Sequence, residues 1–200
     1  MTSALHFLKA ARQCEIAELE QLQRTSALVD LLGRLIHALQ KERGLSCVYL
    51  TSHDTPAALA AQIADCERLA RDARAGFDRL DTPAQGARLL SRIAYVLQGM
   101  DALPLLRQRI HDRHVSPEAA AAALTKLVAG LLAVVFEAAD SAADPGISRL
   151  LVALFHFLQG KELAGQERAA GVAAFGACMD TAAAQRQMGG KASGILSFGL

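Results

Sequence analysis

The sequence contains no tryptophan, and only 4% of its 200 residues are aromatic. Because sheet proteins fill their cores largely with aromatic and β-branched side chains, this scarcity argues against a β fold. Alanine and leucine, which both favour helices, are abundant instead. Hydrophobic residues make up 52% of the chain, enough for one real core or at most two small ones. We therefore predict an all-α protein.

An excess of charge is also missing, because 21 basic residues face 20 acidic ones and leave a net charge of +1. Such a chain has no overall field that would draw it to nucleic acid or to acidic membranes. The longest apolar run, Leu127–Phe136, is about half of what a membrane span needs. The segment Met1–Cys14 lacks the apolar stretch and cleavage site of a signal peptide. We expect a cytoplasmic protein with no membrane partner.

Paired cysteines and the usual catalytic motifs are absent as well. The four cysteines form no CxxC pair and are expected to be reduced thiols: Cys14, Cys47, Cys66 and Cys178. GxSxG, HExxH, GxGxxG and P-loop patterns do not occur, so we expect neither an enzyme nor a cofactor. His111 and His114 could share a metal, but two solvated histidines at a helix end are the favoured interpretation, and we predict no metal site. For Cys47, with His37 nearly three turns away, core packing is favoured over redox chemistry.

Helix starts are marked by three hydroxyl residues that precede a proline: Thr55, Thr82 and Ser116. With these marks we predict an up-and-down bundle of about six helices, over residues 4–24, 26–51, 56–80, 83–112, 117–142 and 147–187. In the first helix an apolar stripe is expected to pack against the bundle: Leu5, Leu8, Ile16, Leu19 and Leu22.

Two arginines lie on helix faces that are otherwise apolar. Arg43 shares a face with leucines such as Leu35 and Leu39, and Arg168 shares one with Leu154 and Leu158, together with Lys161. A buried charge needs a partner, which is either a carboxylate or a bound anion. The carboxylate reading uses Glu42, Glu162 or Glu167. In the anion reading, the guanidinium groups of Arg43 and Arg168 converge on a small planar oxyanion, and Gly44 and Gly165 let the helices approach closely.

Four segments resemble the nitrate- and nitrite-sensing NIT family. Residues 39–46, LQKERGLS, are similar to the family's LQxERGLS motif, and residues 159–169, QGKELAGQERA, to its QGKExAGQERA motif. Between them, residues 103–107 (LPLLR) resemble the LPxLR element and residues 144–149 (DPGISR) the DPxISR turn. The matches occur in order over about 140 residues.

The resemblance implies a helical receptor that binds nitrate or nitrite through Arg43 and Arg168, with Arg107 as a secondary candidate, and that signals by helix repacking. In the antiterminators that the chain most resembles, this sensor controls a C-terminal RNA-binding ANTAR domain and thereby transcription of nitrate-assimilation genes. The present chain has a glycine-rich tail where those relatives continue, so RNA binding is not expected of it. Either the effector has been removed, or the natural protein lacks it.

The sequence therefore divides into an N-terminal helix (1–27), a NIT-like sensor (28–188) and a flexible tail (189–200). Two other functions stay open. One is a helical interaction module with internally paired arginines, whose docking surface would be the apolar helix Leu124–Phe136. The other is a truncated regulator without its effector. The oligomeric state is open too, a homodimer included.

Overall fold

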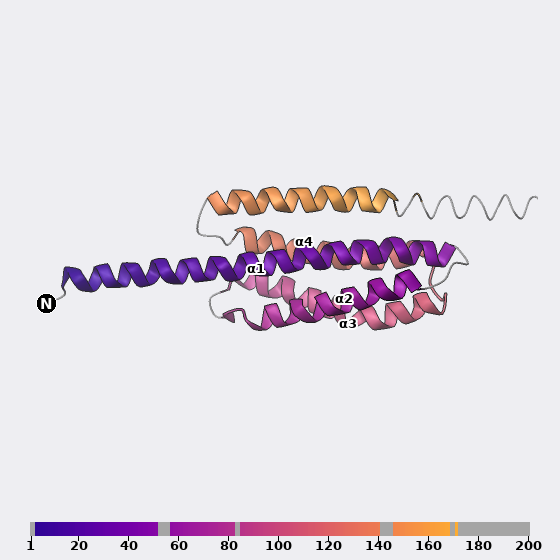
Figure 1. The fold of residues 1–200 in the computed structure, drawn as a ribbon, viewed down its shortest axis with the longest axis horizontal. Coiled ribbons are helices and arrows are strands. Elements are labelled where there is room, and N and C mark those ends of the chain that lie inside the picture. Colours follow the sequence, from indigo (N-terminus) through magenta and orange to yellow (C-terminus); the bar gives the residue numbers. More distant parts are fainter. Residues whose placement is uncertain (1–2, 52–56, 83–84, 141–145, 169–170, 172–200) are drawn as a thin grey trace, which may run out of the picture.

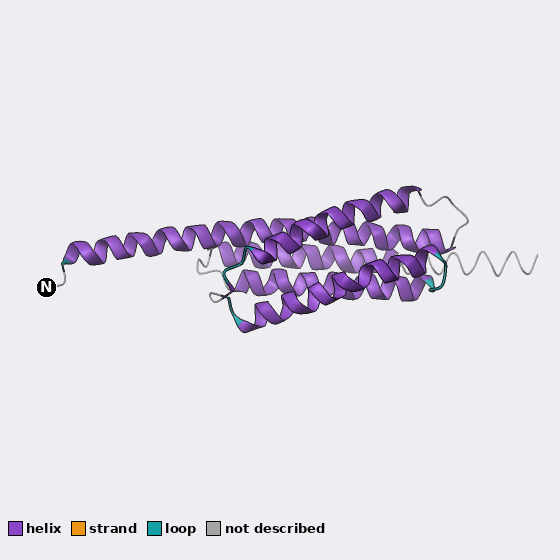
Figure 2. Cartoon of the chain, turned by 90° about the horizontal axis from the view of Figure 1, so that it is seen from below, coloured by secondary structure: helices purple, strands orange, loops and turns teal. Residues whose placement is uncertain are grey.

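The computed structural model describes residues 3–51, 57–82, 85–140, 146–168 and 171, and all statements about the structure concern these residues. Within them the chain forms five helices and no strand, which confirms the all-α prediction (Figure 2). They are α1 (Ala4–Thr51), α2 (Ala57–Asp78), α3 (Ala87–His111), α4 (Pro117–Asp140) and a fifth helix over residues 146–168. The predicted number was about six.

The difference arises in α1, which is one continuous helix where we predicted two. The expected break at Thr25 does not occur. Neither proline nor glycine is present between Ala4 and Gly33, so nothing in this stretch forces the backbone out of the helical conformation. The result is a helix of 48 residues that passes the whole bundle and extends beyond it (Figure 1).

The projecting part of α1 also corrects the packing that we expected for it. Most of its stripe is not packed, because Leu5, Leu8, Ile16 and Leu19 are all more than half exposed, and its last member, Leu22, is half-buried. The first buried residue of α1 is Leu28. From there onward the predicted face is buried as expected, through Leu32, Leu35 and Leu39.

Helix starts follow the sequence only in part. α4 begins at Pro117 as predicted, and the Ser116 hydroxyl accepts a hydrogen bond from the Ala119 N–H at 3.2 Å, which is the arrangement of an N-cap. α3 begins later than predicted, at Ala87 after Gly86, which provides no side-chain cap. Thr55 and residues 144–145 lie outside the described residues.

Around α1 the helices form one core. α2 and α4 lie on either side of α1, α3 packs against α4, and the fifth helix runs alongside α1 and α4 (Figures 1 and 2).

α4 is the most apolar of them, and by length and composition alone Pro117–Ala138 could span a membrane. Its side chains instead fill the core of the bundle, with Leu124, Val128 and Leu131 fully buried. Burial in a core accounts for the same composition.

Candidate functional site: a buried arginine between three helices

Arg43 lies in the core of the bundle and is 1% exposed. Its Nη1 donates a hydrogen bond to Thr125 of α4 at 2.7 Å and another to Glu162 of the fifth helix. Its Nη2 donates to the second oxygen of the Glu162 carboxylate at 3.2 Å. The guanidinium group thus binds a carboxylate with both ends of its fork, as arginine does with planar oxyanions.

Two amides hold the Glu162 carboxylate from either side. Gln40, one turn before Arg43 on α1, donates to it at 2.9 Å, and Gln166, one turn further along the fifth helix, donates at 2.9 Å as well. Glu162 is 4% exposed, so these bonds replace the water that the carboxylate loses. The buried charge of Arg43 is therefore compensated by an internal carboxylate in this state of the protein.

Glu42 forms a second buried ion pair on the opposite side of α1. Its two oxygens accept hydrogen bonds from Nε and Nη2 of Arg107 on α3, both at 2.8 Å. Burial lowers the pKa of Arg107, but its hydrogen bonds to Glu42 outweigh this effect and the pKa is raised. Arg107 also contacts Glu67 of α2 at 3.4 Å. Because consecutive helix residues point about 100° apart, Glu42 and Arg43 bind different neighbours.

Arg168 reaches the surroundings of Arg43 from the fifth helix, although it is exposed and not buried as we expected. The Nη2 atoms of Arg43 and Arg168 lie 2.7 Å and 3.9 Å from the point that a Cβ would occupy at Gly165. Two guanidinium groups therefore converge where this glycine leaves room. The atoms near Gly165 belong to side chains, one of them on the same helix, and nothing lies within 4 Å of the equivalent point at Gly44, so the close approach of helix backbones stays a prediction.

Two cations, Lys161 and Arg168, lie on this part of the fifth helix beside Glu162 and Glu167. Burial lowers the pKa of Lys161, and the nearby Arg168 lowers it further. Lys161 Nζ lies 2.7 Å from Nδ1 of His37, whose own pKa is lowered by burial and by Lys161 and Lys41. Among the described residues, neither Lys161 nor Arg168 forms an ion pair with a carboxylate. An anion placed between them would relieve their repulsion.

Two buried polar atoms next to this cluster have no hydrogen-bond partner in the described part of the chain. They are Nε of Arg43 and Oγ of Ser46, which lies one turn further along the same face of α1. Buried donors are rarely left unpaired, and each such atom marks a place where a ligand or water is expected. The sequence placed Ser46 on the face of Arg43, but gave no sign that its hydroxyl would be free.

The remaining candidates do not contribute to such a site. Arg107 is bound to Glu42, away from Gly165, and Glu167 is exposed. His111 and His114 are both exposed near the end of α3, and the described residues contain no cluster that could hold a metal ion. Cys47 is buried, and burial raises the pKa of its thiol, as expected for a core residue.

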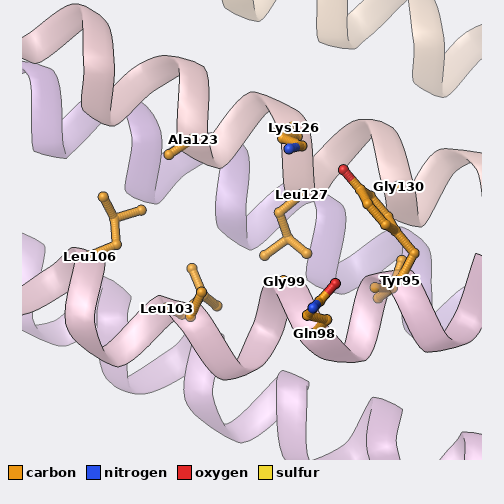
Figure 3. Close-up of a pocket in the computed structure, with 11 residues that line it drawn as sticks. Tyr95, Gln98, Gly99, Leu103, Leu106, Ala123, Lys126, Leu127 and Gly130 are labelled. Atoms are coloured by element: carbon orange, nitrogen blue, oxygen red, sulfur yellow. The ribbon is translucent and has the colours of Figure 1, made fainter.

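A groove between α3 and α4 lies away from the arginines (Figure 3). It has a volume of about 300 Å³ and is mostly apolar, lined by residues such as Leu103, Leu106 and Leu127. Lys126 is its one cation among the lining residues, and it lies 5.8 Å from the centre of the Tyr95 ring. Without converging donors, the groove does not suit a small oxyanion.

The sequence profile of the NIT family, described as nitrate and nitrite sensing, matches residues 34–193. The chain belongs to the NIT family. It is 36% identical over 169 residues to the nitrate regulatory protein of Klebsiella oxytoca, an alignment that covers 82% of this chain and 42% of that protein. The solved structure of the NasR transcription antiterminator is also similar, with a TM-score of 0.75, 34% identity, and coverage of 82% of this chain and 45% of that one. The chain thus spans less than half the length of these relatives.

The NIT match includes every residue of the cluster around Gly165, while the projecting part of α1 lies before it. The family motifs located Arg43 and Arg168. The same segments contain Glu162, which we had named as a possible carboxylate partner, and Gln40 and Gln166, whose hydrogen bonds we did not predict. Thr125 was missed altogether. A single threonine in the apolar helix α4 was the available signal, because a hydroxyl on a buried face needs a partner.

Proposed function

We propose that this chain senses nitrate or nitrite in the cytoplasm, and that Arg43 and Arg168 bind the anion in the space beside Gly165. The observation that carries the proposal is the convergence of the two guanidinium groups on that one point. The names of the relatives, a nitrate regulatory protein and an antiterminator, support the choice of ligand and a role in transcription regulation. The family also supports a sensor rather than an enzyme.

The carboxylate of Glu162 serves as an internal substitute for the ligand. Nitrate and nitrite are small planar oxyanions, and two of their oxygens match the guanidinium fork as the two carboxylate oxygens do. An entering anion exchanges with Glu162 on Arg43, while Gln40 and Gln166 keep their hydrogen bonds to the released carboxylate. Arg168, Lys161 and the unpaired Arg43 Nε are further donors for the anion.

This exchange alters the contact between α1 and the fifth helix, which is how binding becomes a signal. In the unliganded state the Arg43–Glu162 ion pair holds the two helices together. In the liganded state the anion bridges Arg43 and Arg168 instead. An anion shifts the equilibrium between the two states only if it binds one of them more tightly than the other. A bound anion relieves the repulsion between Lys161 and Arg168, and this relief supplies the difference in affinity. In relatives that carry an effector, the repacked helices control antitermination of nitrate-assimilation genes.

The alternative of an interaction module has one observation in its favour, because Arg43 is paired with a carboxylate. Its proposed docking surface is not available, however. Most of Leu124–Phe136 is buried in the core, including Leu124, Leu131 and Val135. The charge surplus at Arg168 and Lys161 is also left without a purpose in this alternative. The anion sensor accounts for both features.

Thermal-shift titration at constant ionic strength tests the proposal, with nitrate, nitrite, chloride and sulfate as ligands. We expect saturable stabilisation by nitrate or nitrite, of about 2.7 kcal/mol at a hundredfold excess over Kd. Constant ionic strength removes the general effect of screening. A cooperatively folded protein that responds to no anion selectively would overturn the proposal.

Arg168→Gln is the most informative variant, since Arg168 is exposed and its loss leaves no buried charge unpaired. We expect it to weaken nitrate binding at least tenfold, which corresponds to the loss of one charged hydrogen bond. Arg149→Gln is the matched control, an exposed arginine on the same helix that lies far along it from Gly165. Equal affinity in the two variants would remove Arg168 from the site.

A further inference from the structure

The part of α1 that projects from the bundle (Figure 1), residues 4–24, carries a row of apolar side chains that are exposed. The exposed fractions are 58% for Leu5, 66% for Leu8, 55% for Ile16 and 65% for Leu19. Nothing in the described part of the chain covers these four side chains, and a continuous row of exposed apolar side chains on a soluble protein marks an interaction surface. A partner that buries the row would stabilise the helix.

Three members of the row, Leu5, Leu8 and Leu19, have the spacing of a coiled-coil seam, whereas Ile16 lies beside the seam at an e position. Together with Leu22, which is half-buried, they occupy a and d positions of a single heptad register. The two positions of that register between Leu8 and Leu19 are held by Arg12 and Glu15, which form an exposed ion pair with each other at 2.8 Å. The seam therefore has two leucines at each end and one cation and one anion in the middle.

This order of residues is complementary to itself when reversed. In an antiparallel pair, a positions face d positions, so Leu5 meets Leu22 of the second copy and Leu8 meets Leu19. The same register places Arg12 opposite Glu15 of the second copy, twice by symmetry. A parallel pair in register would set Arg12 against Arg12 and Glu15 against Glu15, which is repulsive.

We propose that residues 4–24 of α1 form an antiparallel coiled coil with the same segment of a second copy of this chain. The length of the projecting helix suits this arrangement, since Leu5 reaches only as far as Leu22 of the second copy, which is half-buried, and the first fully buried residue of α1 is Leu28. The two bundles then lie at opposite ends of the shared segment. The interface is independent of the anion site and lies before the residues that match the NIT family.

Analytical ultracentrifugation of the full chain over a range of concentrations tests the association. We expect a dimer whose dissociation constant rises at least about a hundredfold in Leu8→Ser, because each dimer loses two buried leucines. Phe7→Ser is the matched control, since Phe7 is 63% exposed beside Leu8 but points away from the seam, and it should leave the dissociation constant within about threefold. A monomer at all concentrations, or equal effects of the two variants, would overturn the proposal.

Charge reversal tests the central pair of the seam. Arg12→Glu places a glutamate opposite Glu15 of the second copy, twice by symmetry, and should raise the dissociation constant of the dimer about tenfold. The double variant Arg12→Glu with Glu15→Arg restores the opposite charges between the two copies. It also restores the ion pair within each helix. Failure of the double variant to recover the wild-type dissociation constant would contradict the antiparallel register.

Disulfide cross-linking decides the orientation in a background with Cys14→Ser and Cys178→Ser, since Cys47 and Cys66 are buried. Chains with Leu8→Cys and chains with Leu19→Cys are oxidised separately and as a mixture. Antiparallel pairing predicts that the mixed disulfide forms at least ten times faster than either symmetric one. Faster formation of the symmetric disulfides would show a parallel pair and overturn the proposal.

Discussion

Glu42 and Arg43 are consecutive residues of opposite charge, and both side chains are buried. Each has an opposite charge on a different helix, Arg107 on α3 for Glu42 and Glu162 on the fifth helix for Arg43. Two adjacent charges in one core would be costly without such partners. At the proposed anion site, the cations Lys161 and Arg168 have no comparable carboxylate among the described residues, so their protonation and anion binding should be linked.

The linkage predicts a pH dependence of nitrate binding. Burial and the repulsion of Arg168 lower the pKa of Lys161, and a bound anion raises it again by favouring the charged form. The affinity for nitrate should therefore be greatest at pH values below the pKa of Lys161 in the free protein. It should fall as the pH rises through this pKa, which is lower than that of an ordinary lysine. Calorimetric titrations from neutral to alkaline pH measure this fall.

Lys161→Met should bind nitrate more weakly at neutral pH and lose the alkaline decline. Lys126→Met changes a lysine of the groove between α3 and α4 and should keep the wild-type profile. An unchanged decline in Lys161→Met would assign the titration to another group.

At the scale of elements, the packing of the fifth helix shows how far sequence patterns reach. The expected face ran through Leu154, Leu158, Lys161 and Arg168. Of these four residues Leu158 is buried, and the other buried residues of the helix are Leu151 and Glu162. A repeat of seven drifts by about 20° per heptad on a straight helix, so the face was misplaced by part of a turn. The continuations of that face at Val172 and Phe175 lie outside the described residues.

By contrast, the leucine face of α1 and the start of α4 were predicted correctly. Leu32, Leu35, Leu39 and Arg43 share one face over three turns, and a hydroxyl cap with a proline marks one boundary without ambiguity. Sequence also identified the two arginines through their motifs. It could not decide between the carboxylate and the anion as the partner of Arg43, because that choice depends on which residues meet across the bundle.

The contact of the fifth helix with α1 depends on the missing side chain at Gly165. In Gly165→Ala the new Cβ would lie 2.7 Å from Nη2 of Arg43, so the guanidinium group or the helix has to move. We expect nitrate affinity to fall at least tenfold, measured by calorimetry, because the converging arginines are displaced. In Gly160→Ala, the control on the same helix, the Cβ meets nothing within 4 Å and stability should rise by up to about 1 kcal/mol. Equal nitrate affinity in both variants would contradict the assigned position of the anion.

At the scale of the whole molecule, the two ion pairs connect α1 to both sides of the bundle. Glu42→Gln leaves Arg107 without its buried partner and should lower the free energy of unfolding by about 3–5 kcal/mol, measured by urea denaturation. Glu67→Gln, which removes the more distant and half-exposed contact of the same arginine, should cost about 0–1 kcal/mol. Similar losses in both variants would mean that Glu42 has no special part in the fold.

The continuity of α1 has a mechanical consequence. Arg43 and Leu5 belong to one unbroken helix and are separated by about 55 Å along its axis. Without a hinge between them, a tilt of α1 by about 5° at Arg43 displaces Leu5 by about 5 Å. In the proposed exchange, a rearrangement of less than an ångström around a small ion would thereby be converted into a movement as large as a side chain, delivered at a distance from the ion itself.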